Sequence, residues 1–216
     1  MTSPAPVACF ERADFGAFTV FVATFVPSGT RFHHAHEDLL SYVVYRDGEE
    51  LLCDPGIPAY GAGGAGYASA ARHNGLHDDD AFAPRPSLLV TTAIAAARLD
   101  IERPRADPAK ELRMTAAPVV GRAKTLRIAA TADGLEIEER VVDGGGGEFF
   151  LCAADPAATL EGTSLLVAGA RCTIEGIEAP TLDRWQRARE YGERLPCTTL
   201  KARAGAHTRL RIRDVR

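Results

Sequence analysis

Three histidines and two acidic residues lie within the segment His33-His34-Ala35-His36-Glu37-Asp38. The apolar, β-branched run Leu39–Tyr45 follows at once and predicts a buried strand. Side chains alternate between faces along an extended chain, so His34, His36 and Asp38 would point to the same side. Two imidazoles on one face suit a shared metal ion or the framing of a reacting group. A polar loop ahead of a strand is the alternative interpretation.

A predicted hairpin links this segment to the next acidic residue. The pair Asp47-Gly48 is a strong two-residue turn signal, and Glu49–Cys53 would return beside the first strand. Asp54 would then lie close to His36, and the glycine-rich stretch at residues 57–71 would allow His73 to reach the same place. Two imidazoles and a carboxylate form a donor set for Zn²⁺ with a fourth position left over. The intervals along the chain match no local metal motif, so the residues alone leave the polar-loop interpretation open.

The remainder of the chain predicts one strand after another. Short apolar or alternating runs are separated by turn residues, and only Leu182–Glu193 has loosely helical spacing. The tip His77-Asp78-Asp79-Asp80 is typical of a solvated turn rather than a calcium site. We therefore predict an all-β fold, a large antiparallel β-sandwich, in a single domain over residues 1–216. The predicted strands are Ala17–Val26, Leu88–Ala95, Leu126–Ala130, Leu135–Val142, Phe149–Cys152, Ser164–Val167, Cys172–Ile174 and Thr208–Arg213.

Composition excludes several classes of function. The net charge is −4, the isoelectric point is near 5.9 and there is no basic stripe, which argues against a nucleic-acid partner. The sequence has no uninterrupted apolar stretch of about 18 residues, so we expect no membrane span, and its N-terminus lacks the features of a signal peptide. The five scattered cysteines predict mostly buried free thiols, with a single bridge left open. No Gly-X-Ser-X-Gly elbow supports a serine nucleophile.

An ordered series of motifs resembles the signature of the heparinase II/III-like polysaccharide lyases. In that family a block H-x-H-x-D-x-L-S-F/Y leads to a D-P-G turn, a tyrosine and an A-H-N-T segment. This sequence has His34-Ala35-His36-Glu37-Asp38-Leu39-Leu40-Ser41-Tyr42, then Asp54-Pro55-Gly56, then Tyr60, and then Arg72-His73-Asn74. The series covers most of the chain and is more specific than any one of its parts.

The resemblance implies a fold and an activity. It implies the C-terminal β-sandwich of a bacterial lyase, next to an α/α toroid, with a cleft for an anionic, uronate-containing polysaccharide such as heparin, heparosan or alginate. Cleavage would proceed by β-elimination, which needs a neutralised carboxylate, a base and an acid. The parent protein would be periplasmic or secreted.

The resemblance also assigns roles to individual residues. His34 would take part in catalysis at the cleft, whereas His36, Asp54 and His73 would hold a structural zinc. Tyr60 and Arg72 would contact the substrate. Asp38 would either orient an imidazole or serve as a simple carboxylate at the edge of a strand.

Departures from the family pattern leave alternatives open. Arg72 and Gly75 stand where the family has alanine and threonine, which affects the substrate contacts more than the metal. The 216 residues do not include the toroid, so we expect this chain alone to be catalytically incomplete. A stand-alone carbohydrate-binding or zinc-binding module is the alternative function. A cupin is disfavoured because Leu40 and Ser41 stand where its glutamate ligand belongs.

Overall fold

The computed structural model describes residues 10–24, 40–56, 72–78, 98–102, 110–117, 122–188 and 193–215. These ranges contain β-strands and no α-helix, and hence no helix long and apolar enough to cross a membrane. The strands are β1 (Phe10–Phe15), β2 (Phe18–Ala23), β3 (Tyr42–Arg46), β4 (Glu49–Leu52), β5 (Gly75–Asp78), β6 (Arg98–Glu102), β7 (Glu111–Ala117), β8 (Lys124–Thr131), β9 (Gly134–Val141), β10 (Gly147–Ala153), β11 (Thr159–Glu161), β12 (Ser164–Val167), β13 (Ala170–Arg187) and β14 (Leu195–Asp214).

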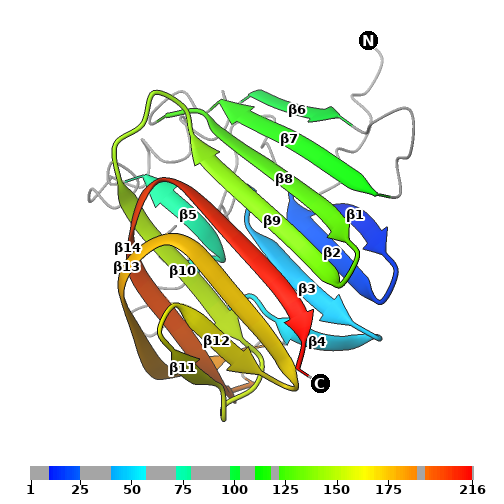
Figure 1. Cartoon of the computed structure of the whole chain (residues 1–216), viewed down its shortest axis with the longest axis vertical. Helices are drawn as coiled ribbons and strands as arrows, with labels where there is room; N and C mark the ends of the chain where they lie inside the picture. Colours follow the sequence, from blue (N-terminus) through cyan, green and yellow to red (C-terminus); the bar gives the residue numbers. More distant parts are fainter. Residues whose placement is uncertain are drawn as a thin grey trace.

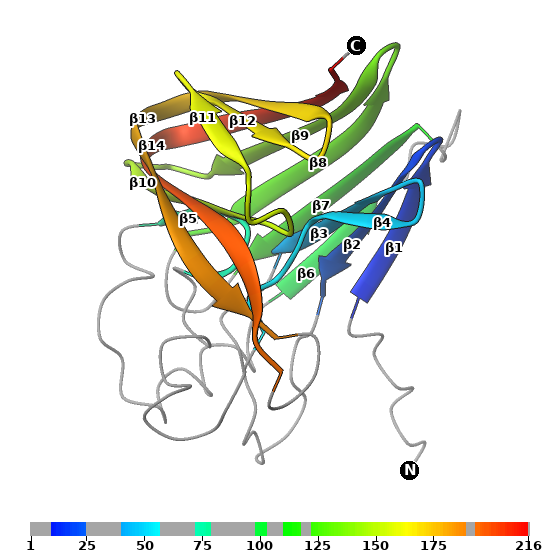
Figure 2. The same ribbon diagram turned by 90° about the horizontal axis from the view of Figure 1, so that it is seen from below.

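The described strands join in one antiparallel sheet that curls into a sandwich (Figures 1 and 2). The order along its main path is β1-β2-β3-β4-β10-β14-β9-β8-β7-β6. Strand β14 connects the two layers, because residues 198–204 pair with β10 whereas residues 207–213 pair with β9. The predicted all-β, antiparallel sandwich is confirmed.

The inner faces of the two layers form the main core. Val20 and Val44 come from β2 and β3, and Ile128, Ile137 and Ile212 come from β8, β9 and β14. Each of these side chains is at most 1% exposed. Burying a branched aliphatic side chain contributes roughly 1.5–3 kcal/mol, so this face supplies much of the stability.

The predicted hairpin between β3 and β4 is confirmed, but its first strand is shorter than expected. Asp47 and Gly48 both have positive φ angles, 52° and 84°, as the two-residue turn requires. Strand β3 begins at Tyr42 instead of Leu39. The reason is that Leu40 has a φ of 63°, which turns the chain so that this side chain enters the core while its N–H donates to the carbonyl oxygen of Ala23.

The loosely helical spacing over Leu182–Glu193 does not correspond to a helix where the structure describes this stretch. Leu182 through Arg187 form the end of β13 and pair with β14, with Trp185 opposite Cys197 and Arg187 opposite Leu195. Residues 189–192 lie outside the described part of the chain. The apolar spacing was misleading because Trp185 packs against a small outer cluster, whereas its neighbours along the strand are exposed.

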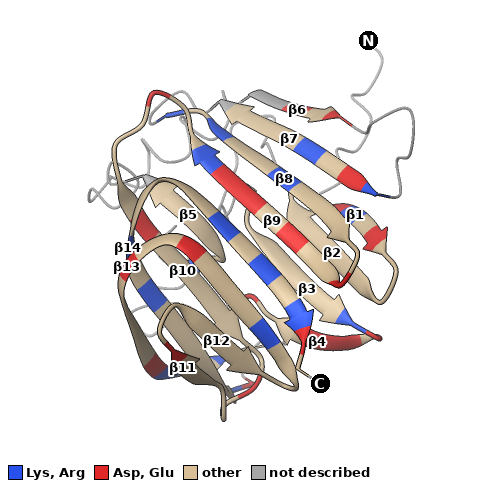
Figure 3. Ribbon diagram, viewed as in Figure 1, with Lys and Arg blue, Asp and Glu red and all other residues tan. Residues whose placement is uncertain are grey.

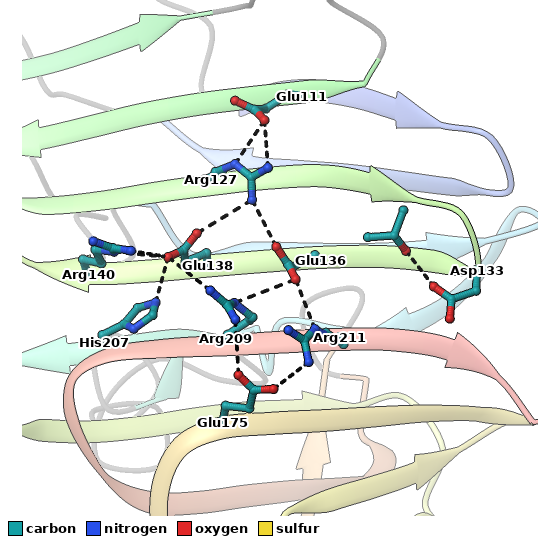
Figure 4. A network of polar contacts seen from close by, with 11 residues as sticks. Glu111, Arg127, Asp133, Glu136, Glu138, Arg140, Glu175, His207, Arg209 and Arg211 are labelled. Atoms are coloured by element: carbon teal, nitrogen blue, oxygen red, sulfur yellow. Dashed lines mark hydrogen bonds and ion pairs between the residues drawn. The ribbon is translucent and has the colours of Figure 1, made fainter.

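Acidic and basic residues alternate across the neighbouring strands β7, β8, β9 and β14 (Figure 3). Acidic and basic side chains succeed one another from strand to strand, and we call this set the Glu–Arg ladder (Figure 4). Arg127 contacts Glu111, Glu136 and Glu138, and Arg211 contacts both Glu136 and Glu175. The ladder consists of Glu111, Arg127, Glu136, Glu138, Arg140, Glu175, His207, Arg209 and Arg211.

The ladder predicts a loss of stability in acid. Partial burial acts to raise the pKa of Glu138. Hydrogen bonds with Arg140 and His207 and the charges of these two residues lower that pKa by more than burial raises it, so the net shift is downward. A carboxyl group with a lowered pKa stabilises the fold above its unfolded pKa, near 4.5, and loses that contribution as the pH falls through its folded value. Urea unfolding between pH 7 and pH 3 should therefore show a smaller decline for Glu138→Gln than for the wild type.

The control for this prediction is Glu161→Gln, which removes an exposed carboxylate from β11. At pH 7, Glu138→Gln should lower the free energy of unfolding by about 1 kcal/mol, and Glu161→Gln should lower it by about half of that or less. Equal acid sensitivity of the wild type and Glu138→Gln would contradict the assignment.

Candidate metal site

The centre of the site is a close contact between Asp54 and His73. Asp54 lies two residues after the end of β4, and His73 lies two residues before the start of β5. The Oδ2 atom of Asp54 is 2.6 Å from Nδ1 of His73. The imidazole is 1% exposed and the carboxylate 35%, so the pair lies at the edge of the interior. The structure thus brings together two residues that lie 19 positions apart in the sequence.

The turn Asp54-Pro55-Gly56 holds the carboxylate in place. The N–H of Gly56 donates to Oδ1 of Asp54 at 2.8 Å, while Oδ2 faces His73. Gly56 has a φ of 62°, and a Cβ at this position would lie 2.3 Å from the carbonyl oxygen of Ala188. The N–H of Ala188 in turn donates to the carbonyl oxygen of Pro55. Glycine is therefore required here, and the turn is fastened to the end of β13.

Asn74 fixes the backbone beside His73. Its carboxamide is fully buried and inserts between the ends of β4 and β10. Nδ2 donates to the carbonyl oxygens of Tyr42 and Cys53 at 2.7 and 2.9 Å, and Oδ1 accepts from the N–H of Cys152 at 2.6 Å. One side chain thus satisfies three buried backbone groups, which belong to β3, to β10 and to the residue after β4.

His77 also supports His73, although the acidic run at residues 77–80 predicts a solvated turn. That prediction is wrong for His77 and Asp78, which belong to β5, and residues 79–80 lie outside the described part of the chain. Nε2 of His77 donates to the carbonyl oxygen of His73 at 2.6 Å. Burial, and then the charge of Lys124, lowers the pKa of His77 to about 3, so the ring is neutral. The four-residue separation between His73 and His77 was the sequence feature that could have indicated this contact.

Arg72 lies over an aromatic ring on the other side of His73. Its guanidinium carbon is 4.2 Å from the centroid of the Trp185 ring, a cation–π contact. Trp185 packs on a small apolar cluster formed by Cys53, Phe150, Cys152 and Cys197. Arg72 is partly exposed, and its predicted contact with a substrate stays a prediction.

Several predicted site residues lie outside the described ranges. These are His34, His36, Asp38 and Tyr60. Within the described part of the chain, Asp54 and His73 are not joined by a further His, Cys, Asp or Glu in a group that could hold a metal ion. The predicted arrangement of His36 with Asp54 and His73 therefore stays a prediction.

The chemistry of the observed pair fits a zinc ion. Two donors on one tetrahedral Zn²⁺, each at about 2.0–2.1 Å, lie about 3.3 Å from each other. Nδ1 of His73 and Oδ2 of Asp54 are 2.6 Å apart, so a movement of about 0.7 Å would let both bind one ion. Alternatively, Oδ2 of Asp54 could accept a hydrogen bond from Nδ1–H of His73 and leave Nε2 of that ring to bind the metal.

A family comparison identifies the chain. The family model for the heparinase II/III-like C-terminal domain matches residues 3–155, which include Asp54, His73 and Asn74. The chain belongs to the heparinase II/III-like C-terminal family. A search of curated proteins found no match.

Solved structures support the fold of this heparinase II/III-like domain. A heparinase III with methylated lysines superposes with a TM-score of 0.67 at 11% identity, covering 94% of this chain and 34% of that protein. Heparan sulfate lyase HepC from Pedobacter heparinus gives a TM-score of 0.64 at 11% identity, covering 97% of this chain and 37% of that one. The heparinase II/III-like chain thus spans about a third of the length of these structures.

Proposed function

We propose that this chain is the C-terminal β-sandwich of a polysaccharide lyase that cleaves uronate-containing polysaccharide by β-elimination. In this proposal it carries a structural zinc and one side of the active cleft, and an α/α toroid provides the other side. Membership of the heparinase II/III-like C-terminal family supports the lyase assignment. The observation that carries the proposal is the contact between His73 and Asp54, which joins two motifs of the signature.

In the proposed site His36, Asp54 and His73 hold the zinc. The ion would tie the turn after β4 to the segment before β5, because each contributes one ligand. Asn74 and His77 fix the backbone that carries His73. These contacts keep the imidazole oriented while the metal supplies a further cross-link.

Catalysis in this proposal depends on residues outside the metal set. His34 would face the uronate at the cleft and take part in the proton transfer of the elimination. Tyr60 and Arg72 would contact the substrate, and the Arg72 guanidinium suits the C6 carboxylate, whose neutralisation lowers the barrier. The stacking on Trp185 would limit the motion of that guanidinium.

Zinc content gives the first test. We expect about one zinc per chain after dialysis against a zinc buffer, and close to none for His73→Ala. At a free zinc concentration about 100-fold above Kd, binding adds about 2.7 kcal/mol to the unfolding free energy, so chelation should lower the Tm of the wild type only.

The matched control is His207→Ala, because His207 is a partly exposed histidine of the Glu–Arg ladder and should leave the zinc content unchanged. Stoichiometric zinc in His73→Ala, or none in the wild type, would contradict the site.

The lyase assignment is tested by following the ultraviolet absorbance of the C4–C5 double bond that β-elimination creates. A protein that contains this chain together with its toroid should release unsaturated uronate from heparan sulfate, heparosan or alginate. The chain alone should release little or none. His34→Ala in the larger protein should abolish cleavage and keep the zinc. Absence of cleavage on all three polymers, with the polymer still bound, would favour the binding-module alternative.

A further inference from the structure

Three cysteine side chains meet on the face of the sheet opposite the main core. Cys53 directly follows β4, Cys152 lies in β10 and Cys197 lies in β14. All three are fully buried, together with Phe150 and the partly buried Trp185. The Sγ atoms of Cys53 and Cys152 are 3.3 Å apart, and the side chain of Cys197 also contacts that of Cys152.

The register of the strands places Cys53 directly opposite Cys152. Leu52 pairs with Ala153, and the N–H of Cys53 donates to the carbonyl oxygen of Cys152 at 2.8 Å. The sulfur atoms need to approach by about 1.2 Å to reach a bond of about 2.05 Å. The two sulfur atoms therefore already lie close enough for a small local movement to bring them to bonding distance.

We propose that Cys53 and Cys152 form a disulfide when the chain folds in the presence of a disulfide oxidant such as glutathione disulfide. One cysteine thiolate attacks a sulfur of the oxidant and releases one glutathione, leaving a mixed disulfide. The second cysteine then attacks the protein sulfur of that intermediate and releases the second glutathione. Two protein thiols are oxidised, one oxidant is reduced to two thiols, and the two protons pass to the departing thiolates.

We expect the oxidation to take place during folding, because the two thiols are inaccessible once the chain has folded. Both side chains are 0% exposed in the folded chain, where a large oxidant cannot reach them. The bridge would close a loop between residues 99 positions apart, which restricts the unfolded chain. It would also restrain the end of β4 immediately before Asp54. The inference stands independently of the proposed lyase function.

The test is to refold the full chain with glutathione disulfide and, in parallel, with a phosphine reductant. Alkylation under denaturing conditions should count five free thiols in the reduced sample and three in the oxidised one. Peptide mapping should find Cys53 linked to Cys152, and the oxidised sample should melt several degrees higher. Five free thiols after oxidation, or a bridge between any other pair, would overturn the proposal.

Two variants sharpen this test. Cys172 lies in the main core, away from the sulfur cluster, so Cys172→Ala should still lose two of its four thiols on oxidation. Cys152→Ala should keep all four of its free thiols under the same oxidising conditions. If Cys152→Ala does not fold, the peptide map of the wild type still decides the question, since it names the linked residues directly.

Discussion

Asn74→Ala should lower the free energy of unfolding by about 4 kcal/mol. This expectation follows from the three buried backbone groups that depend on one carboxamide, the carbonyl oxygens of Tyr42 and Cys53 and the N–H of Cys152. Each buried group left without a partner costs roughly 1–3 kcal/mol, and water entering the space would recover part of the total. Because native domains are stable by only about 5–15 kcal/mol, this single change threatens folding.

Urea unfolding followed by circular dichroism measures the effect, and Asn74→Asp serves as the control of matched size. The aspartate retains an acceptor for the N–H of Cys152 but places oxygen against the two carbonyl oxygens, so it should be as harmful as alanine near pH 7. Protonation of that aspartate in acid should restore one donor and narrow the gap to the wild type. A cost below about 1 kcal/mol for Asn74→Ala would show that the inserted amide is not required.

The sequence predicts the sandwich and the hairpin that precedes Asp54, because both depend on strong local signals. The grouping of Asp54 with His73 depends on the longer series of motifs instead. The Asp47-Gly48 turn has one favoured geometry, and the alternation along β9 assigns its faces. The turn at Leu40 is a different case. A leucine with positive φ has no local signal, since tertiary contacts with the core and with Ala23 impose the conformation.

The buried contacts of the polar residues next to His73 could not be predicted from the sequence for a related reason. Asn74 and His77 look like ordinary loop residues in the sequence, and only the convergence of β3, β4, β5 and β10 gives them buried partners. The inward orientation of the Glu139 side chain could have been predicted from the sequence. Its position in β9 has the same parity as Ile137 and Val141, so a strictly alternating strand points this carboxylate inward. A buried carboxylate needs partners, and the sequence does not name them.

The structure shows the partners of the Glu139 carboxylate. Because of them, substitution of Glu139 is the second change for which we expect a large loss of stability. The carboxylate is 1% exposed and lies 2.6 Å from Nζ of Lys124. It accepts from the N–H of Leu76 at 3.1 Å and from the hydroxyl of Tyr42 at 3.3 Å. Burial, and then the charge of Glu139, raises the pKa of Tyr42 well above its usual value, so the hydroxyl keeps its proton and remains a donor. These contacts connect β9 to β3, β5 and β8.

Glu139→Ala should therefore destabilise the fold by about 3–5 kcal/mol, because it leaves a mostly buried ammonium and a buried N–H without their acceptor. The adjacent Glu138 faces the Glu–Arg ladder on the other side of the strand, and Glu138→Ala should cost only about 1 kcal/mol.

A double-mutant cycle separates the ion pair from the rest of the network. Lys124→Met alone leaves the Glu139 carboxylate buried without its cation and should be costly. Combining Lys124→Met with Glu139→Gln removes both charges and retains an acceptor for Leu76, so the pair should cost less than the sum of the two single changes. Additive costs, or equal losses for Glu139→Ala and Glu138→Ala in urea unfolding, would mean that the inward carboxylate does not hold these strands together.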